Sequence, residues 1–325
     1  MEQKVLRVST LMVAGALALR LLSAVAPNIS VSEEVASWLI FLQTGRLIRP
    51  ASIEFQPPAE ETVPETTAGS LEPPQAVLTF SEDSAENLAI NCSFTYSADL
   101  PTLLTQPLNW DLKDENPTVL ILHSHATESY ASTGDYEEVS PYHTQNTDYN
   151  MVSIGAYVAA LLEAGGISVL HDTTLHDTPS YNASYTNSRQ SVQEYLDAYP
   201  SIRLVLDLHR DSYEDENGNQ IVRSVFSEGS QLAQLMFVVG TDYGGLTHPE
   251  WQENLALALK LQTQLETLCP GICRPINLRS QRFNQDLSTG SVLIEVGASG
   301  NSREEALRAA EVLAEGILSL AHGSR

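Results

Sequence analysis

The 325-residue chain is short of basic residues, and this shortage limits the partners it can have. Its 17 lysines and arginines stand against 41 aspartates and glutamates, which gives a formal charge of -24 at pH 7. Nucleic-acid binding needs a basic face that neutralises phosphates, so we expect no nucleic-acid partner. The same charge argues against electrostatic docking on anionic lipid.

Cysteine is also scarce. Cys92, Cys269 and Cys273 are too few for a disulfide framework or a four-thiolate zinc site. Cys269 and Cys273 either close a small loop outside the cell or are two ordinary thiols near a helix end. Internal repeats are absent, and a hydrophobic content of 42% is enough for the core of one large domain with attachments.

The composition divides the chain into four segments. Lys4 and Arg7 precede an apolar stretch, so we expect residues 1–27 to form an uncleaved signal anchor in the cell membrane, with the rest outside the cytoplasm. A cleaved signal peptide is the alternative. Residues 28–50 indicate a juxtamembrane amphipathic segment, and 51–75, rich in proline and acid, a flexible linker. Residues 76–325 then form the main domain.

Apolar strands alternate with amphipathic helices in this domain. This alternation predicts an α/β fold with a mostly parallel, doubly wound sheet and helices on both faces. Hydrophobic runs indicate strands at 118–122, 167–170, 204–208, 222–226, 235–239 and 291–294. Apolar spacing and capping signals indicate helices at 149–163, 188–198, 249–266 and 305–320.

Polar side chains follow three of these strands. His125 and Glu128 come after the strand at 118–122, His209 after the strand at 204–208, and Glu295 after the strand at 291–294. The carboxyl ends of parallel strands form the crevice in which open α/β sheets bind ligands. Two imidazoles and a carboxylate suit Zn²⁺, so we expect His125, Glu128 and His209 to bind one zinc ion per chain.

Glu295 is expected to act as general base and acid beside this zinc, because a carboxylate so near a core has to be paired, metal-bound or active. A plain salt bridge between Glu295 and Arg210 is the structural alternative. His123 lies two residues before His125, so in an extended segment both would point to the same side. We expect His125 to be the ligand and His123 to orient ligands or contact substrate.

Five more polar residues are expected around the same crevice, where they would bind substrate or orient the ligands. They are Arg210, Asp211, Asn284, Gln285 and Asp286.

These motifs carry a resemblance to a known family. The segments His123 to Tyr130, Leu206 to Asp211, Asn284 to Ser288 and Ile294 to Gly297 resemble stage II sporulation protein P, in order and at plausible spacing. The resemblance covers about residues 76–320. Ser124 stands where the family motif commonly has threonine, an exchange that should not touch the metal.

The family is similar to zinc-dependent N-acetylmuramoyl-L-alanine amidases with a doubly wound α/β fold. The resemblance implies cleavage of the amide that joins the stem peptide to the glycan of peptidoglycan, with an additional endopeptidase activity. It also implies work at the sporulation septum during engulfment, beside stage II sporulation proteins D and M.

Two other functions fit the same residues. A zinc carboxypeptidase-like hydrolase also uses His-x-x-Glu with a distant His and Glu, and needs a cation for the terminal carboxylate, for which Arg282 or Arg210 would serve. A non-catalytic cell-wall-binding scaffold is the second alternative. Such a scaffold would be expected to lack a ligand or the base, and none is missing here.

Overall fold

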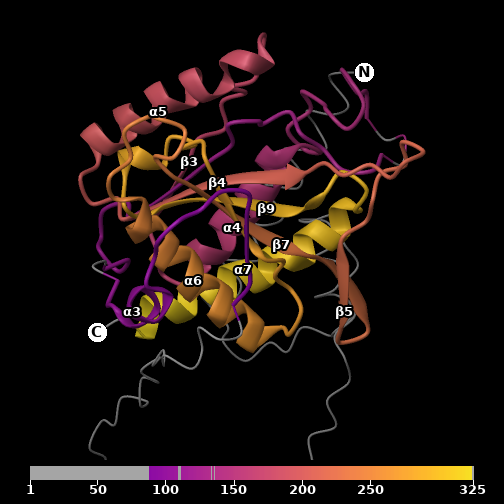
Figure 1. Ribbon diagram of the computed structural model, residues 1–325. Coiled ribbons are helices and arrows are strands. Elements are labelled where there is room, and N and C mark those ends of the chain that lie inside the picture. Colours follow the sequence, from indigo (N-terminus) through magenta and orange to yellow (C-terminus); the bar gives the residue numbers. More distant parts are fainter. Residues whose placement is uncertain (1–87, 109–110, 133, 135, 324–325) are drawn as a thin grey trace, which may run out of the picture. The chain divides into compact units, whose positions relative to one another are not determined.

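A seven-stranded sheet forms the centre of the computed structural model (Figure 1), which describes residues 88–108, 111–132, 134 and 136–323. The strands lie in the order β1-β8-β7-β9-β4-β2-β3. Their bounds are β1 Ile90–Cys92, β2 Val119–Leu122, β3 Val169–His171, β4 Leu204–Asp211, β7 Leu235–Gly240, β8 Ile276–Arg279 and β9 Ser291–Ala298. A separate antiparallel hairpin consists of β5 Ser224–Ser227 and β6 Ser230–Ala233.

The sheet consists of two parallel blocks that run in opposite directions. Strands β9, β4, β2 and β3 are parallel to one another, and so are β7, β8 and β1. The blocks meet where β7 pairs antiparallel with β9. The prediction of an α/β fold with a mostly parallel sheet is therefore confirmed, and the sheet is mixed rather than wholly parallel. The reversal at β7 was not foreseen, because hydrophobic periodicity carries no information on strand direction.

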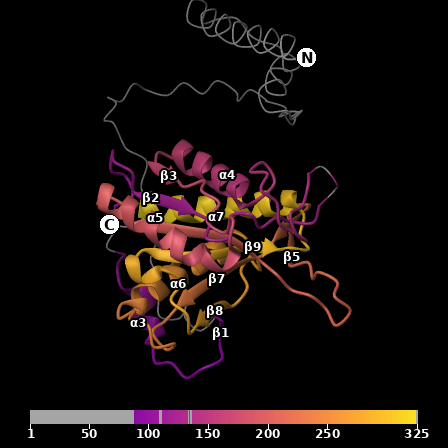
Figure 2. The same cartoon turned by 90° about the horizontal axis from the view of Figure 1, so that it is seen from above.

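Helices cover both faces of this sheet, as Figures 1 and 2 show. The large core packs one face against α3 Leu100–Thr105, α4 Met151–Ala164, α6 Trp251–Leu268 and α7 Arg303–Gly323. On the other face, α5 Ser184–Ala198 covers a smaller cluster that includes Leu120, Val205 and Val192. Alternate residues of a strand point to opposite faces, so Leu206 and Leu208 enter the large core while Asp207 and His209 face the α5 side.

Helix starts follow from local capping. The Oδ1 atom of Asn150 accepts the Val152 N–H at 3.0 Å, which begins α4 two residues after the expected start. Ser302 and Glu305 form the expected capping box of α7, since each side chain accepts the other's backbone N–H, at 3.2 and 3.1 Å. Strands β1 and β8 and helix α3 span only three, four and six residues, too few for a periodic signal.

The predicted membrane localisation has to be corrected. In the part of the chain that the structure describes, no helix is long and apolar enough to cross a membrane. The expected anchor at 1–27, the amphipathic segment at 28–50 and the linker at 51–75 lie outside the described residues. The three cysteines are free, so Cys269 and Cys273 are two ordinary thiols.

Candidate active site

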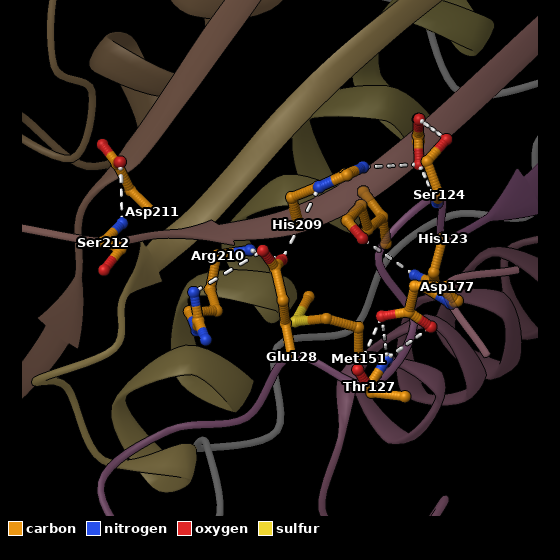
Figure 3. Close-up of polar contacts among 12 residues, drawn as sticks. His123, Ser124, Thr127, Glu128, Met151, Asp177, His209, Arg210, Asp211 and Ser212 are labelled. Carbon is orange, nitrogen blue, oxygen red and sulfur yellow. Dashed lines mark hydrogen bonds and ion pairs between the residues drawn. The ribbon is translucent and has the colours of Figure 1, made fainter. Parts of the chain in front are cut away.

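The turn after β2 brings His125 and Glu128 to one side. The strand ends at Leu122, and the chain then turns so that the Glu128 N–H donates to the His125 carbonyl at 3.2 Å. Thr127 fixes the turn from outside, because its hydroxyl donates to the Asp177 carboxylate at 2.6 Å (Figure 3). His125 and Glu128 are both buried, with 9% and 5% of their surface exposed.

His209 comes from the neighbouring strand β4 and is held between two carboxylates (Figure 3). Its Nε2 lies 2.8 Å from Asp207 Oδ1, and its Nδ1 lies 3.6 Å from Glu128 Oε2. Burial favours the neutral imidazole, but the carboxylates, Asp207 foremost, raise the pKa of His209 to about 10. The His125 ring stands perpendicular to that of His209, with centroids 5.3 Å apart.

Asp207 was not singled out from the sequence. It lies two positions before His209 on the same face of β4, and this spacing is the signal that could have revealed it. Its carboxylate accepts hydrogen bonds from the Ser124 N–H at 2.8 Å and from the Ser124 hydroxyl at 2.6 Å. Asp207 therefore ties the turn after β2 to the ring of His209.

Arg210 orients Glu128 rather than facing open space. Its backbone N–H donates to Glu128 Oε2 at 3.2 Å, and its Nη1 lies 3.5 Å from Glu128 Oε1. The rest of the guanidinium donates to the carbonyls of Ser129 and Tyr142, at 2.8 and 2.7 Å. With 4% exposure and these contacts, Arg210 has little capacity left for a substrate.

Glu295 reaches the site from β9. In the register of β4 and β9 it is the direct partner of His209. The Oε2 atom of Glu295 is buried and has no hydrogen-bond partner among the described residues, and no ion pair joins Glu295 to Arg210 there. Burial raises the pKa of Glu295 to about 8, with Glu128 acting in the same direction and His209 against it. Such a carboxyl group can exchange a proton near neutral pH.

Two tyrosines that sequence reasoning missed enclose His125. Tyr181 stacks on the His125 ring with centroids 4.1 Å apart, and Tyr185 meets it edge-on at 5.4 Å. Tyr181 belongs to the 3₁₀ turn η2 Tyr181–Ala183, and Tyr185 to the first turn of α5. Tyr181 is 51% exposed, so it forms part of the outer rim of the site. Nothing in the local sequence pattern distinguished these residues from other tyrosines.

His123 lies on the other face of the sheet, although an extended segment would have placed it beside His125. Its Nδ1 bonds to the Leu208 carbonyl at 2.9 Å, and its Nε2 lies 3.0 Å from His171 Nε2. The turn that begins at Ser124 reverses the side on which His125 emerges. His123 is fully buried, so it supports the residue before His209 and does not contact substrate.

Three polar residues before β9 connect the elements that surround the site. They are Asn284, Gln285 and Asp286. Asn284 donates to the Tyr185 carbonyl at 2.8 Å, and Asp286 forms a two-pronged ion pair with Arg189 of α5, both contacts at 2.8 Å. Gln285 bonds to the backbone of β7. Gln285 and Asp286 also line a cavity of about 470 Å³ beside the amino ends of β4 and β9, which contains none of His125, Glu128, His209 and Glu295.

Asp211, the last residue of β4, lies at the edge of the site (Figure 3) and forms an ion pair with Arg274, Oδ2 to Nη1 at 2.8 Å. Its negative charge also helps to raise the pKa of Glu295, after the larger effect of burial.

The donors around His209 suit a metal, although no preformed cluster stands there. Among the described residues, no three His, Cys, Asp or Glu side chains are already arranged as a metal-binding group. The His125 Nδ1 atom, however, is buried and has no hydrogen-bond partner in the part of the chain that the structure describes. With Nε2 of His209 bound to Asp207, the free Nδ1 faces Glu128. A ligating histidine commonly gives its other nitrogen to a carboxylate, so the donor set fits Zn²⁺.

The fold and the site together define a mixed α/β protein with a buried His-Glu-His-Glu group at the carboxyl edge of four parallel strands. The chain belongs to the stage II sporulation protein P family, whose model matches residues 51–318. It is 26% identical over 212 residues to stage II sporulation protein P of Bacillus subtilis (strain 168), a match that covers 62% of this chain. The chain spans about half the length of that relative.

Solved structures of amidases also match, but weakly. The N-acetylmuramoyl-L-alanine amidase AmiC2 of Nostoc punctiforme gives a TM-score of 0.37 at 17% identity, covering 62% of this chain and 95% of that one. The CwlD amidase of Clostridioides difficile, solved in complex with the GerS lipoprotein, gives 0.38 at 14% identity, covering 64% and 95%. Scores this low carry no argument about fold or function.

Proposed function

We propose that this protein is a zinc-dependent peptidoglycan hydrolase that cleaves the amide between N-acetylmuramic acid and the L-alanine of the stem peptide. Membership of the stage II sporulation protein P family supports work on the cell wall in sporulation. One observation of the site supports the mechanism: His125 Nδ1 and Glu295 Oε2 are buried on either side of the His209–Glu128 contact, and neither atom has a hydrogen-bond partner among the described residues. Buried polar atoms normally have partners, so both atoms are expected to serve a ligand.

His125, Glu128 and His209 would hold the zinc, which supplies Lewis-acid polarisation and a lowered pKa for water. Asp207 keeps the proton of His209 on Nε2, so that Nδ1 remains a donor to the metal. Arg210 fixes the Glu128 carboxylate through backbone and guanidinium contacts. The carboxylates that raise the pKa of His209 favour a second proton on its ring, at the Nδ1 position that the metal would take, so binding the metal would displace that proton.

Glu295 would move the protons of the reaction. In its ionised form it takes a proton from the attacking water and then gives that proton to the leaving amine of L-alanine. The raised pKa of Glu295 suits both steps, because the group is neither a permanent anion nor a permanent acid near neutral pH. His125, stacked under Tyr181, keeps one wall of the site rigid.

As the resemblance to the family implies, we further propose a role in degrading the septal wall during engulfment, with stage II sporulation proteins D and M as partners and with an additional endopeptidase activity. The two arginines considered for the carboxypeptidase-like alternative are both engaged among the residues that the structure describes. Arg210 is bonded to Glu128 and to two backbone carbonyls, and Arg282 forms an ion pair with Asp286 at 3.2 Å.

The test is digestion of purified cell wall by the wild-type protein and by Glu295→Gln. We expect the wild type to release intact stem peptides and leave the glycan whole. Glu295→Gln should keep its zinc and lose roughly 10²–10⁴-fold in turnover, the usual contribution of a positioned acid and base. Glu304→Gln, at an exposed position in the first turn of α7, is the matched control.

Three results would contradict parts of this proposal. Release of terminal residues alone would indicate a carboxypeptidase. Loss of zinc together with activity in Glu295→Gln would make Glu295 a ligand. Near-normal turnover of that variant would remove Glu295 from the mechanism.

A further inference from the structure

Two arginines meet one aromatic ring at the edge of the site beyond Glu295. The guanidinium carbon of Arg274 lies 5.0 Å from the centroid of the Tyr213 ring, and that of Arg223 lies 5.1 Å from the same centroid. Such stacking holds a guanidinium in place while leaving its N–H groups free to bind. In a chain with 17 basic residues against 41 acidic ones, two arginines on one ring are a local exception.

Only one of the two charges is neutralised. Arg274 forms its ion pair with Asp211 at 2.8 Å. Arg223 forms no ion pair with any residue that the structure describes, and its Nε–H is buried without an acceptor. Arg223 as a whole remains partly exposed. A guanidinium that stacks on a ring, lacks an ion pair and has an unsatisfied donor has a strong preference for an anion.

The backbone fixes this pair beside β9. The Arg223 N–H donates to Asn301 Oδ1 at 3.3 Å, and Asn301 in turn accepts the N–H of Ala298 at 2.9 Å. The Arg223 carbonyl accepts the Gln234 N–H at 2.8 Å, and the Gln234 carbonyl accepts the N–H of Gly297, two residues after Glu295, at 3.0 Å. Arg274 donates its N–H to the carbonyl of Leu235, the first residue of β7.

Tyr213 is held just as firmly, at the base of the loop between β4 and β5. The Ile221 N–H donates to the Tyr213 carbonyl at 2.8 Å, which closes the loop below its tip. Figure 2 shows this loop extending away from the body of the protein. The two arginines therefore lie at the same edge as His209 and Glu295, on the side opposite His125 in the strand order β2-β4-β9-β7.

We infer that Arg223, supported by Arg274 and Tyr213, forms an anion subsite that binds a carboxylate of the substrate peptide while its amide lies at Glu295. This inference rests on the proposed function, because it assigns the peptide side of that same site. A peptide carries at least its terminal carboxylate, and a planar guanidinium is the side chain that best matches a carboxylate in shape and charge.

The experiment compares two soluble muropeptides that differ only in their stem-peptide carboxyl groups, free in one and converted to primary amides in the other. Cleavage of the glycan–peptide amide is measured at several salt concentrations. The wild type should prefer the free acid by about tenfold in kcat/KM, mainly through KM, because a partly exposed charge-assisted hydrogen bond contributes about that factor. The preference should shrink as salt rises.

Arg223→Met should lose about tenfold on the free acid and no longer distinguish the two substrates. Arg223→Lys should keep part of the preference, since it keeps the charge without the planar fork. Arg279→Met, an exposed arginine at the far end of β8, is the matched control and should behave as the wild type. Equal cleavage of both substrates by the wild type, or an unchanged preference in Arg223→Met, would overturn the subsite.

A binding measurement separates this inference from the proposed function. Titration calorimetry measures the affinity for the free peptide without any turnover. The acid and the amide form of the peptide are each titrated into the wild type and into Arg223→Met, with equal amounts of folded protein. Tighter binding of the acid to the wild type alone supports the subsite even if neither muropeptide is cleaved, an outcome that would count against the amidase activity only. Equal binding of both forms to both proteins would refute the subsite.

Discussion

The two ring nitrogens of His209 face two different carboxylates, and this arrangement accounts for the electrostatics of the site. Nε2 is bound to Asp207 at 2.8 Å, and Nδ1 faces Glu128 at 3.6 Å. Glu295 is the partner of His209 in the next strand. Three carboxyl groups thus surround one imidazole in a buried place. These carboxylates raise the pKa of His209 against the effect of burial, whereas burial is the main cause of the raised pKa of Glu295, with Glu128 and Asp211 acting in the same direction and His209 against it.

The raised pKa of Glu295 predicts how the stability of metal-free protein depends on pH. The folded pKa of about 8 exceeds the ordinary value of 4.5, so between these values the folded state keeps a proton that the unfolded state has released. The contribution of Glu295 is therefore favourable at low pH and is lost as pH rises toward 8. The free energy of unfolding of the wild type, relative to Glu295→Gln, should fall by on the order of 1–3 kcal/mol from pH 5 to pH 8.

The measurement is urea unfolding of chelator-treated wild type and Glu295→Gln across that range. Glu304→Gln, exposed on α7, serves as control and should run parallel to the wild type. A constant difference between wild type and Glu295→Gln would mean that Glu295 ionises as an ordinary surface carboxylate.

The four central residues of the site could be found from the sequence because each comes shortly after an apolar run. His125, Glu128, His209 and Glu295 depend only on strand ends meeting at one edge. Their chemical roles stay predictions. The side on which His123 lies could not be found, because a single turn at Ser124 changes it. Tyr181 and Tyr185 were missed since they enter from η2 and α5, whose distance from β2 no local pattern reveals.

At the scale of elements, helix α4 approaches β2 more closely than ordinary side chains allow. A Cβ atom added at Gly155 would lie 2.4 Å from His123 Nε2 and 2.6 Å from His171 Nε2. His123 cannot move away easily, because its other nitrogen is bound to Leu208 of β4. The absence of a side chain at Gly155 therefore helps to set the position of the strand that carries His209.

Gly155→Ala should destabilise the protein by about 1–3 kcal/mol, although alanine is the better helix former by about 1 kcal/mol. The contrast is Gly316→Ala in α7, whose added Cβ would meet the movable end of Leu265 and should cost less. Thermal unfolding of both variants gives the comparison. A Gly155→Ala variant as stable as the wild type would show that the space between α4 and β2 can open without cost.

The elements themselves were predictable to different degrees, for physical reasons. The long helices α4, α6 and α7 have enough turns for an apolar stripe, so their expected positions agree within a few residues. Strand β6 and its turn at Gly229 lie in a polar segment without alternation. The three-residue strand β1 is stabilised by pairing with β8, a contact between segments far apart in the chain. Such pairing overrides local preference.

At the scale of the whole molecule, a ligand that binds only the folded state raises the melting temperature. If His125, Glu128 and His209 hold zinc, the metal at 100 times its dissociation constant should stabilise the protein by about 2.7 kcal/mol. For a domain of this size this corresponds to roughly 5–10 °C. Calorimetry of chelator-treated protein with and without Zn²⁺ measures the shift, independently of activity.

His209→Ala removes one ligand and should abolish most of the zinc-induced rise. His143→Ala is the control, because His143 is a partly exposed histidine whose Nδ1 contacts only a backbone carbonyl at 2.9 Å. An equal rise in His209→Ala and wild type would place the metal elsewhere.

The position of β9, where the two parallel blocks meet, has a consequence for the order in which the protein folds. Among the strands that the structure describes, β9 is the last of this sheet in the chain, yet it lies in the middle of the sheet and alone pairs with the block of β7, β8 and β1. During synthesis the ribosome releases all other described strands of the sheet before β9. Until β9 follows, the strands β2, β3 and β4 of one block have no strand that pairs them with β1, β7 and β8 of the other. The sheet, and with it the pairing of His209 with Glu295, can close only after residue 298 has left the exit tunnel. A nascent chain arrested before that point is therefore expected to lack the pairing of His209 with Glu295 and to remain sensitive to protease.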